Sequence, residues 1–119
     1  MTVAPEKLRR LLAESDLFEL LEEADLDRLV SISGTRSFTS GEAIFLRGQP
    51  ANQLYAVVRG RVRAVATAPD GRELVLRLFD PGDFFGEMAL LDGGGRSATA
   101  EAAEESGLLV IQRLSLIHI

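Results

Sequence analysis

The stretch FFGEMALLDGGGRSATA, residues 84–100, combines a glycine at a predicted helix start with one glutamate and one arginine. Gly86 has no side chain, so a ligand could approach backbone N–H groups closely at this point. The good helix formers in residues 87–91 predict a short helix whose N-terminal end would attract an anion. Arg96 can hold two phosphate oxygens at once through its planar guanidinium, and Glu87 can accept a hydrogen bond from a sugar hydroxyl. The stretch therefore fits a ribose that carries a phosphate.

The order of these residues resembles the phosphate-binding cassette of cyclic nucleotide-binding domains. The matching groups are Gly86-Glu87, Ala89-Leu90-Leu91 and Arg96-Ser97-Ala98-Thr99. Glycines that fall where this family turns between strands extend the likeness to roughly residues 17–113; they are Gly41, Gly48, Gly60, Gly71 and Gly82. One departure is Gly95, where many members of the family carry proline.

The resemblance implies a role for each residue of the site. Glu87 would bind the ribose 2'-hydroxyl and Arg96 the cyclic phosphate. The remaining implied contacts are the backbone groups of Gly86, Met88 and Ala89 with the anion, Ser97 with the phosphate or a guanine edge, and Ala64 and Leu76 with the base and sugar. Ordinary core packing explains Ala64 and Leu76 equally well. The sequence leaves open whether the ligand is cAMP, cGMP or another cyclic nucleotide.

From residue 35 onward, short apolar or alternating runs are separated by glycine turns every 8 to 12 residues, which is typical of an all-β roll or barrel. The predicted strands are residues 35–39, 43–46, 54–58, 61–67, 73–79, 98–102 and 108–113. Asp70-Gly71 predicts a tight hairpin turn between two of them. The predicted fold is mainly β with flanking helices: a jelly-roll-like, double-stranded β-helix barrel of the cyclic nucleotide-binding domain type, with a short helix in the cassette.

Helical spacing of apolar residues marks the region before the strands. Pro5 and Glu6 form a favourable helix start, and that helix is expected to end near residues 15–16. A second helical patch leads into Asp25, a predicted N-cap, followed by an apolar face. Both helices are expected to pack on the outside of the barrel.

Composition excludes several other classes of function. The chain has 119 residues, a net charge of -5, no cysteine and one histidine, His118. The negative charge argues against contact of this chain with nucleic acid. A metal-dependent barrel enzyme needs several histidines, a haem sensor needs an axial ligand, and a nucleophilic serine needs a base. We therefore expect no metal site, no cofactor and no enzymatic activity. No apolar run predicts a membrane span, and a cytoplasmic location is expected.

Among cyclic nucleotide-binding domains, residues 81–91 resemble the sensor half of Crp/Fnr-type bacterial transcription regulators. This likeness implies that an output domain missing from the C-terminal side binds DNA. Regulatory modules of kinases, channels and esterases are similar, and so is a non-catalytic interaction domain that has lost its ligand. The oligomeric state of the parent stays open, with a homodimer among the alternatives.

The expected domain covers residues 1–113, with helices in 1–33 and the β-roll in 34–113. Residues 114–119, the string LSLIHI, stand where the family continues into a charged helix. This string also matches the translated end of a common transposase sequencing adaptor. We therefore expect a C-terminally truncated domain with a non-native tail at 114–119.

Overall fold

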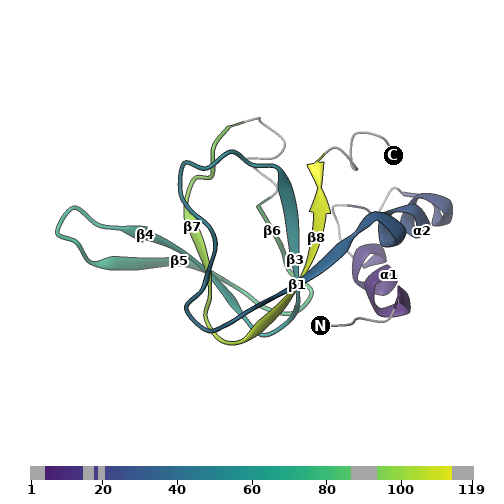
Figure 1. Ribbon diagram of the computed structural model, residues 1–119, viewed down its shortest axis with the longest axis horizontal. Coiled ribbons are helices and arrows are strands. Elements are labelled where there is room, and N and C mark those ends of the chain that lie inside the picture. Colours follow the sequence, from purple (N-terminus) through teal and green to yellow (C-terminus); the bar gives the residue numbers. More distant parts are fainter. Residues whose placement is uncertain (1–4, 15–17, 19–20, 87–93, 114–119) are drawn as a thin grey trace.

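The computed structural model describes residues 5–14, 18, 21–86 and 94–113, in which helices lead into a set of short strands (Figure 1). The helices are α1 (Pro5–Ala13) and α2 (Glu23–Ile32). The strands are β1 (Gly34–Phe38), β2 (Ala43–Phe45), β3 (Gln53–Arg59), β4 (Val62–Thr67), β5 (Glu73–Phe79), β6 (Phe84–Phe85), β7 (Thr99–Ala102) and β8 (Ser106–Gln112). The short cassette helix predicted for residues 87–91 lies outside the described residues, as does the tail.

The strands form two four-stranded antiparallel sheets, in the orders β1-β8-β3-β6 and β2-β7-β4-β5. The sheets enclose an interior between them, while the ends of β4 and β5 project from the body as a hairpin (Figure 1). Non-consecutive strands are neighbours in both sheets, so each sheet is assembled from distant parts of the chain. The predicted mainly β, jelly-roll-like fold is confirmed.

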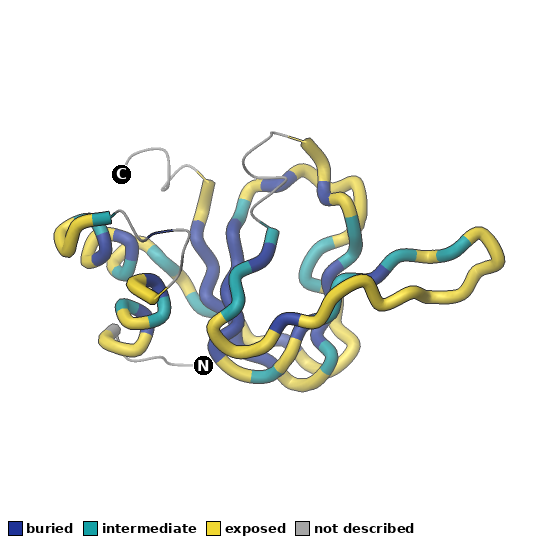
Figure 2. Tube along the Cα trace, turned by 180° about the vertical axis from the view of Figure 1, so that it is seen from behind, coloured by how far each residue is buried: buried dark blue, intermediate teal, exposed yellow. Residues whose placement is uncertain are grey.

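Strands β3 and β8 separate two apolar layers, and both appear as continuous buried segments in Figure 2. Successive side chains of a strand point to opposite faces of its sheet. Leu54 and Leu109 therefore join the cluster packed against the helices, while Tyr55 and Leu108 join the cluster between the sheets. Because both faces of these strands are covered, their sequences are apolar without a clear alternation.

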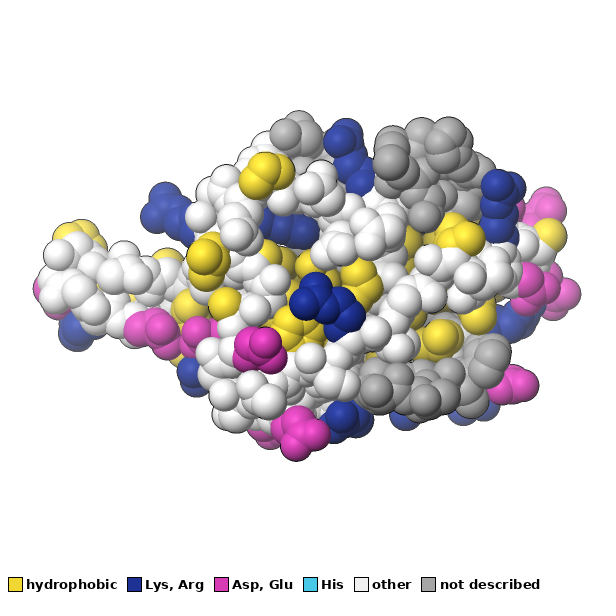
Figure 3. Space-filling model, in the orientation of Figure 1, with side chains coloured by type: hydrophobic (Ala, Val, Ile, Leu, Met, Phe, Trp, Pro, Cys, Tyr) yellow, Lys and Arg dark blue, Asp and Glu magenta, His cyan; other side chains and the backbone are white. Residues whose placement is uncertain are grey.

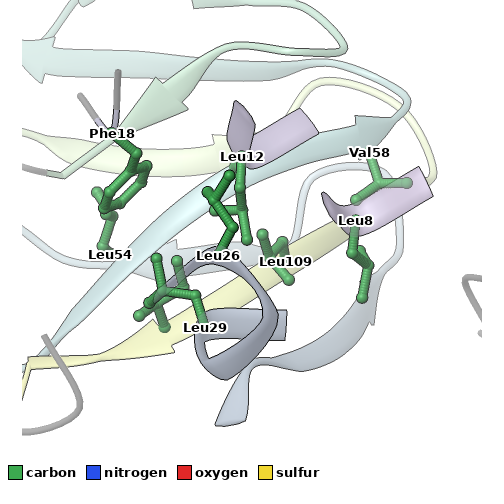
Figure 4. Packing of buried hydrophobic residues seen from close by; sticks show 10 residues of the cluster. Leu8, Leu12, Phe18, Leu26, Leu29, Leu54, Val58 and Leu109 are labelled. Atoms are coloured by element: carbon green, nitrogen blue, oxygen red, sulfur yellow. The ribbon is translucent and has the colours of Figure 1, made fainter. Parts of the chain in front are cut away.

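Helices α1 and α2 cover the outer face of the sheet that contains β3 and β8, as expected (Figure 4). Leu12 of α1 and Leu29 of α2 are both fully buried in this layer. Helix α1 begins at Pro5 as the sequence predicts. The N-cap of α2 is Glu22, not Asp25. Asp25 lies in the first turn of α2, where a carboxylate is favourable because of the helix dipole.

The five turn glycines predicted from the sequence all have a positive φ, between 85° and 97°. Gly71 closes the β4–β5 hairpin, where its N–H donates to the carbonyl of Ala68 at 2.9 Å. Such a φ is costly for residues with a Cβ atom, so glycine at these positions fixes where the strands end. Within the part of the chain that the structure describes, no helix has the length and apolar character needed to cross a membrane.

Candidate functional site

A cavity of about 210 Å³ opens between the two sheets beside the loop that carries Arg96. Its apolar wall is made by aromatic side chains from three strands: Phe45 of β2, Phe79 of β5 and Phe85 of β6. The rings of Phe79 and Phe85 stack with their centroids 5.0 Å apart. An apolar wall with a few polar groups at one side is the usual arrangement of a small-molecule site.

Gly86 follows β6 at the edge of this cavity and has a φ of 87°. A Cβ atom at this position would lie 2.6 Å from Nη1 of Arg96. Two independent constraints therefore require glycine: the left-handed backbone and the close approach of a guanidinium. The carbonyl of Gly86 accepts a hydrogen bond from that same Nη1 at 2.8 Å.

Arg96 is held between the two sheets with only 5 % of its surface exposed. Its Nη1 donates to Gly86, and its Nη2 donates to the carbonyl of Gln53 at 2.6 Å. The guanidinium also lies over the ring of Phe45, 4.1 Å from the ring centroid, which is favourable for a cation. Its Nε is buried and has no hydrogen-bond partner among the described residues. The hydrogen-bonding capacity of this side chain is therefore not fully used by the described residues.

The charge of Arg96 is not balanced by any carboxylate in the described part of the chain, because none of the observed ion pairs includes it. Burial lowers the pKa of its guanidinium from the ordinary value, and the nearby Tyr55 opposes this shift. Moving a cation out of water without an anionic partner is unfavourable. The site is therefore suited to an anion that enters from outside.

The structure brings some of the predicted site residues together and leaves others apart. Gly86, Arg96, Ser97 and Ala64 all line the cavity. Leu76 does not line it and is 58 % exposed on β5. Glu87, Met88 and Ala89 lie outside the described residues.

The position of Leu76 follows from an irregularity between β4 and β5. Ala64 pairs with Arg77, but the next residue, Val65, pairs with Val75, so Leu76 is an extra residue without a partner on β4. A bulge of this kind changes which side chains point into the barrel. Arg77, which the sequence reasoning did not select, lines the cavity instead, with its guanidinium 4.8 Å from the centroid of Phe79. Arg77 precedes Phe79 by two positions, and residues two apart on a strand face the same side of the sheet. An inward-facing Phe79 would therefore have indicated Arg77.

The described residues contain no group of three or more His, Cys, Asp or Glu side chains that could hold a metal ion. Among the described residues, the polar groups at the cavity are two guanidinium groups, one hydroxyl and backbone atoms. These groups bind anions and polar ligands by hydrogen bonding and charge. They offer no set of metal ligands.

The profile of the cyclic nucleotide-binding domain family matches residues 35–119. The chain belongs to this family.

Related proteins are found among transcription regulators. The chain is 41% identical over 99 residues to the cyclic AMP receptor protein of Thermus thermophilus, covering 83% of this chain and 46% of that protein. It is 31% identical over 106 residues to a CRP-like cAMP-activated global transcriptional regulator of Mycobacterium tuberculosis, covering 89% of this chain and 47% of that protein. The chain thus spans less than half the length of these curated relatives.

Solved structures show the same fold. The regulatory domain of Toxoplasma gondii PKA, crystallised with cAMP, superposes with a TM-score of 0.91 at 30% identity, covering 97% of this chain and 44% of that chain. The N-terminal domain of a transcriptional regulator from Streptomyces coelicolor superposes with a TM-score of 0.82 at 33% identity, covering 89% of this chain and 74% of that chain. Homologues of this domain therefore occur both in Crp-like regulators and in kinase regulatory subunits.

Proposed function

We propose that this domain binds a cyclic nucleotide, cAMP or cGMP, in the cavity beside Arg96. The observation that carries the proposal is the buried guanidinium of Arg96, which has no carboxylate partner among the described residues and whose Nε has no hydrogen-bond partner there. A buried donor without a partner costs about 1–3 kcal/mol, and hydrogen bonds to a charged group are the stronger ones. A cyclic phosphate would supply both the missing acceptor and the missing negative charge.

We assign to the other predicted residues the binding roles that the family resemblance implies. Gly86 leaves room for the phosphate and for Arg96 at the same place, and Ser97 adds a hydroxyl at the cavity. Ala64 would lie against the sugar or the base. Glu87 would accept a hydrogen bond from the ribose 2'-hydroxyl, and backbone groups of residues 88–89 would complete the anion site.

Calorimetric titration with cAMP, cGMP and linear 5'-AMP tests this proposal. Arg96→Ala should weaken binding by more than about tenfold, since truncating one partner of a buried charge pair costs about 2–5 kcal/mol. Arg72→Ala is the matched control, because Arg72 is exposed in the β4–β5 turn. Thermal unfolding of each variant establishes that it is folded.

Two outcomes would contradict the proposal. Unchanged affinity in Arg96→Ala would remove the phosphate assignment. A folded chain that binds none of the nucleotides would favour the alternative of an interaction domain without a ligand. Glu87→Gln provides a finer test, because it should reduce discrimination against 2'-deoxy cyclic nucleotides while leaving phosphate binding in place.

We further propose that the domain is the sensor half of a Crp/Fnr-type transcription regulator, without enzymatic activity and located in the cytoplasm. Support comes from the two regulators described above, each of which is about twice as long as the matched region. DNA binding would then belong to an output domain on the C-terminal side. A longer reading frame in the source DNA, continuing past residue 113 into a helix and an output domain, would support this assignment. A frame that continues into a kinase or channel sequence would contradict it.

A further inference from the structure

A second cavity, of about 380 Å³, adjoins the first at Arg96 and Phe45. Arg96 and Phe45 line both cavities, whereas Arg36, Gln49 and Tyr55 line only the second. The residues of the second cavity come from β1, β2, β3 and β8 and from the loop between β2 and β3. It is therefore a separate space that shares one wall with the nucleotide cavity.

Two of the four amide side chains that line this second cavity have their oxygen atoms engaged. The side-chain oxygen of Gln49 already accepts from the N–H of Leu46 at 2.8 Å. The side-chain oxygen of Gln53 already accepts from the hydroxyl of Tyr55. Since the acceptor of each amide is engaged, the –NH₂ groups are what these side chains still offer. These two –NH₂ groups and the guanidinium groups of the lining favour a ligand that carries acceptors.

The charged residues that line the second cavity also favour an anionic ligand. Arg36 and Arg96 both line the second cavity, and none of its lining residues is acidic. No ion pair among the described residues includes either arginine. Both guanidinium groups act on the phenol of Tyr55, since each lowers its pKa against the larger, opposite effect of burial. The fields of two cations therefore converge on one small space in a chain whose net charge is -5.

Arg96 is the side chain that the two cavities share. Its buried Nε has no hydrogen-bond partner among the described residues, while both terminal nitrogens of the same side chain are bonded to backbone carbonyls. The face drawn in Figure 3 shows basic and acidic side chains interspersed, with a basic group among apolar side chains near its centre. On that face, the acidic side chains do not cover the basic ones as a continuous layer.

We propose that the second cavity is a binding site for a small oxyanion, a phosphate or carboxylate group held between Arg36 and Arg96. Guanidinium groups bind such planar or tetrahedral oxyanions through paired N–H donors. The amides of Gln49 and Gln53 would supply further donors. The site is distinct from the proposed nucleotide site, because Arg36 does not line the nucleotide cavity.

The shared arginine makes the two sites energetically dependent on each other. An anion in the second cavity would interact with the guanidinium of Arg96, the same group that would hold the cyclic phosphate in the first. Each ligand should therefore weaken the other, and by the same factor, because coupling between two binding equilibria is reciprocal. A metabolite that carries a phosphate or carboxylate could lower the response of the sensor in this way.

The single tyrosine of the chain offers a direct reporter, because Tyr55 is its only tyrosine, there is no tryptophan, and Tyr55 lines the second cavity. Tyrosine fluorescence would be followed while inorganic phosphate, and separately acetate, is added to the whole chain at constant ionic strength. We expect a saturable change with phosphate and a weaker one with acetate. Arg36→Gln should weaken phosphate binding by at least about tenfold, whereas Arg72→Gln should leave it unchanged.

Arg36→Lys keeps the charge but loses the paired donors, so it should lie between the wild type and Arg36→Gln. This variant also serves if Arg36→Gln fails to fold. A fluorescence change that does not saturate would overturn the proposal, and so would equal phosphate affinity in the wild type and both Arg36 variants. Failure of cyclic nucleotide binding would not affect the outcome, because the experiment contains no nucleotide.

Discussion

Replacing Gly86 with alanine tests the contact at the centre of the proposed site. The new Cβ would meet two constraints: a φ of 87° and Nη1 of Arg96 at 2.6 Å. A left-handed backbone costs a residue with a Cβ about 1–2 kcal/mol. Displacing the guanidinium also breaks its bond to the Gly86 carbonyl, and a hydrogen bond to a charged group contributes about 1.5–3 kcal/mol. The free energy of unfolding should therefore fall by about 2.5–5 kcal/mol.

Gly82→Ala separates the cost of the left-handed backbone from the cost of displacing Arg96. Gly82 has a φ of 97° but nothing lies within 4 Å of where its Cβ would be. It should therefore show only the backbone cost of about 1–2 kcal/mol. Urea unfolding followed by circular dichroism measures both variants under the same conditions. The difference between them estimates the cost of displacing Arg96.

A double-mutant cycle completes the test. In an Arg96→Ala background the group that collides with the new Cβ is gone, so Gly86→Ala should cost no more than Gly82→Ala. Cyclic nucleotide affinity should fall in Gly86→Ala and stay near the wild-type value in Gly82→Ala. Equal stability loss for Gly86→Ala and Gly82→Ala in the wild-type background would refute the proposed close contact.

Three further outcomes follow from other parts of the structure. Gly60→Ala should cost about 3 kcal/mol or more, because its Cβ would lie 2.3 Å from Oγ of Ser106 in addition to the positive φ; a loss below that of Gly82→Ala would contradict this packing. Burial raises the pKa of Tyr55 above its ordinary value of 10.0, so absorbance titration of this one tyrosine should show a midpoint above that value. The folded state then favours the neutral phenol, and the stabilisation is present below pH 10.0 and lost as the pH rises through the folded pKa, a dependence that Tyr55→Phe should remove. Leu29→Ala should lower the free energy of unfolding by about 2–5 kcal/mol because Leu29 is fully buried against α1 and the sheet, and a smaller loss would indicate that the helices are loosely docked.

Much of the fold was predictable because its turns are chemically marked. The range predicted for residues 73–79 coincides with β5, and most other strand limits differ by one or two residues. The exception is β6, which has only two residues and shows no alternation of its own. It is a strand because Phe84 and Phe85 pair with Ala56 and Tyr55. Local sequence carries no signal for a partner nearly 30 positions away.

The candidate site was predictable in its chemistry more than in its geometry. A glycine and an arginine at the right separation indicated Gly86 and Arg96, and both line the cavity. No local pattern indicated that Arg96 would donate to the carbonyl of Gln53, 43 positions earlier. It also did not indicate the second cavity, whose residues come together only when β1, β3 and β8 are paired.

By itself, the sequence determined the positions of the turns, the residues available to bind an anion and the family. These properties depend on single residues or short runs: a glycine permits a positive φ wherever it occurs, and a guanidinium carries its charge in any setting. The tertiary structure alone decided that Leu76 has no partner on β4 and how deeply Arg96 is buried. The extra residue in the pairing of β4 and β5 shifts the alternation of side chains along β5, and that pairing depends on contacts between separate parts of the chain.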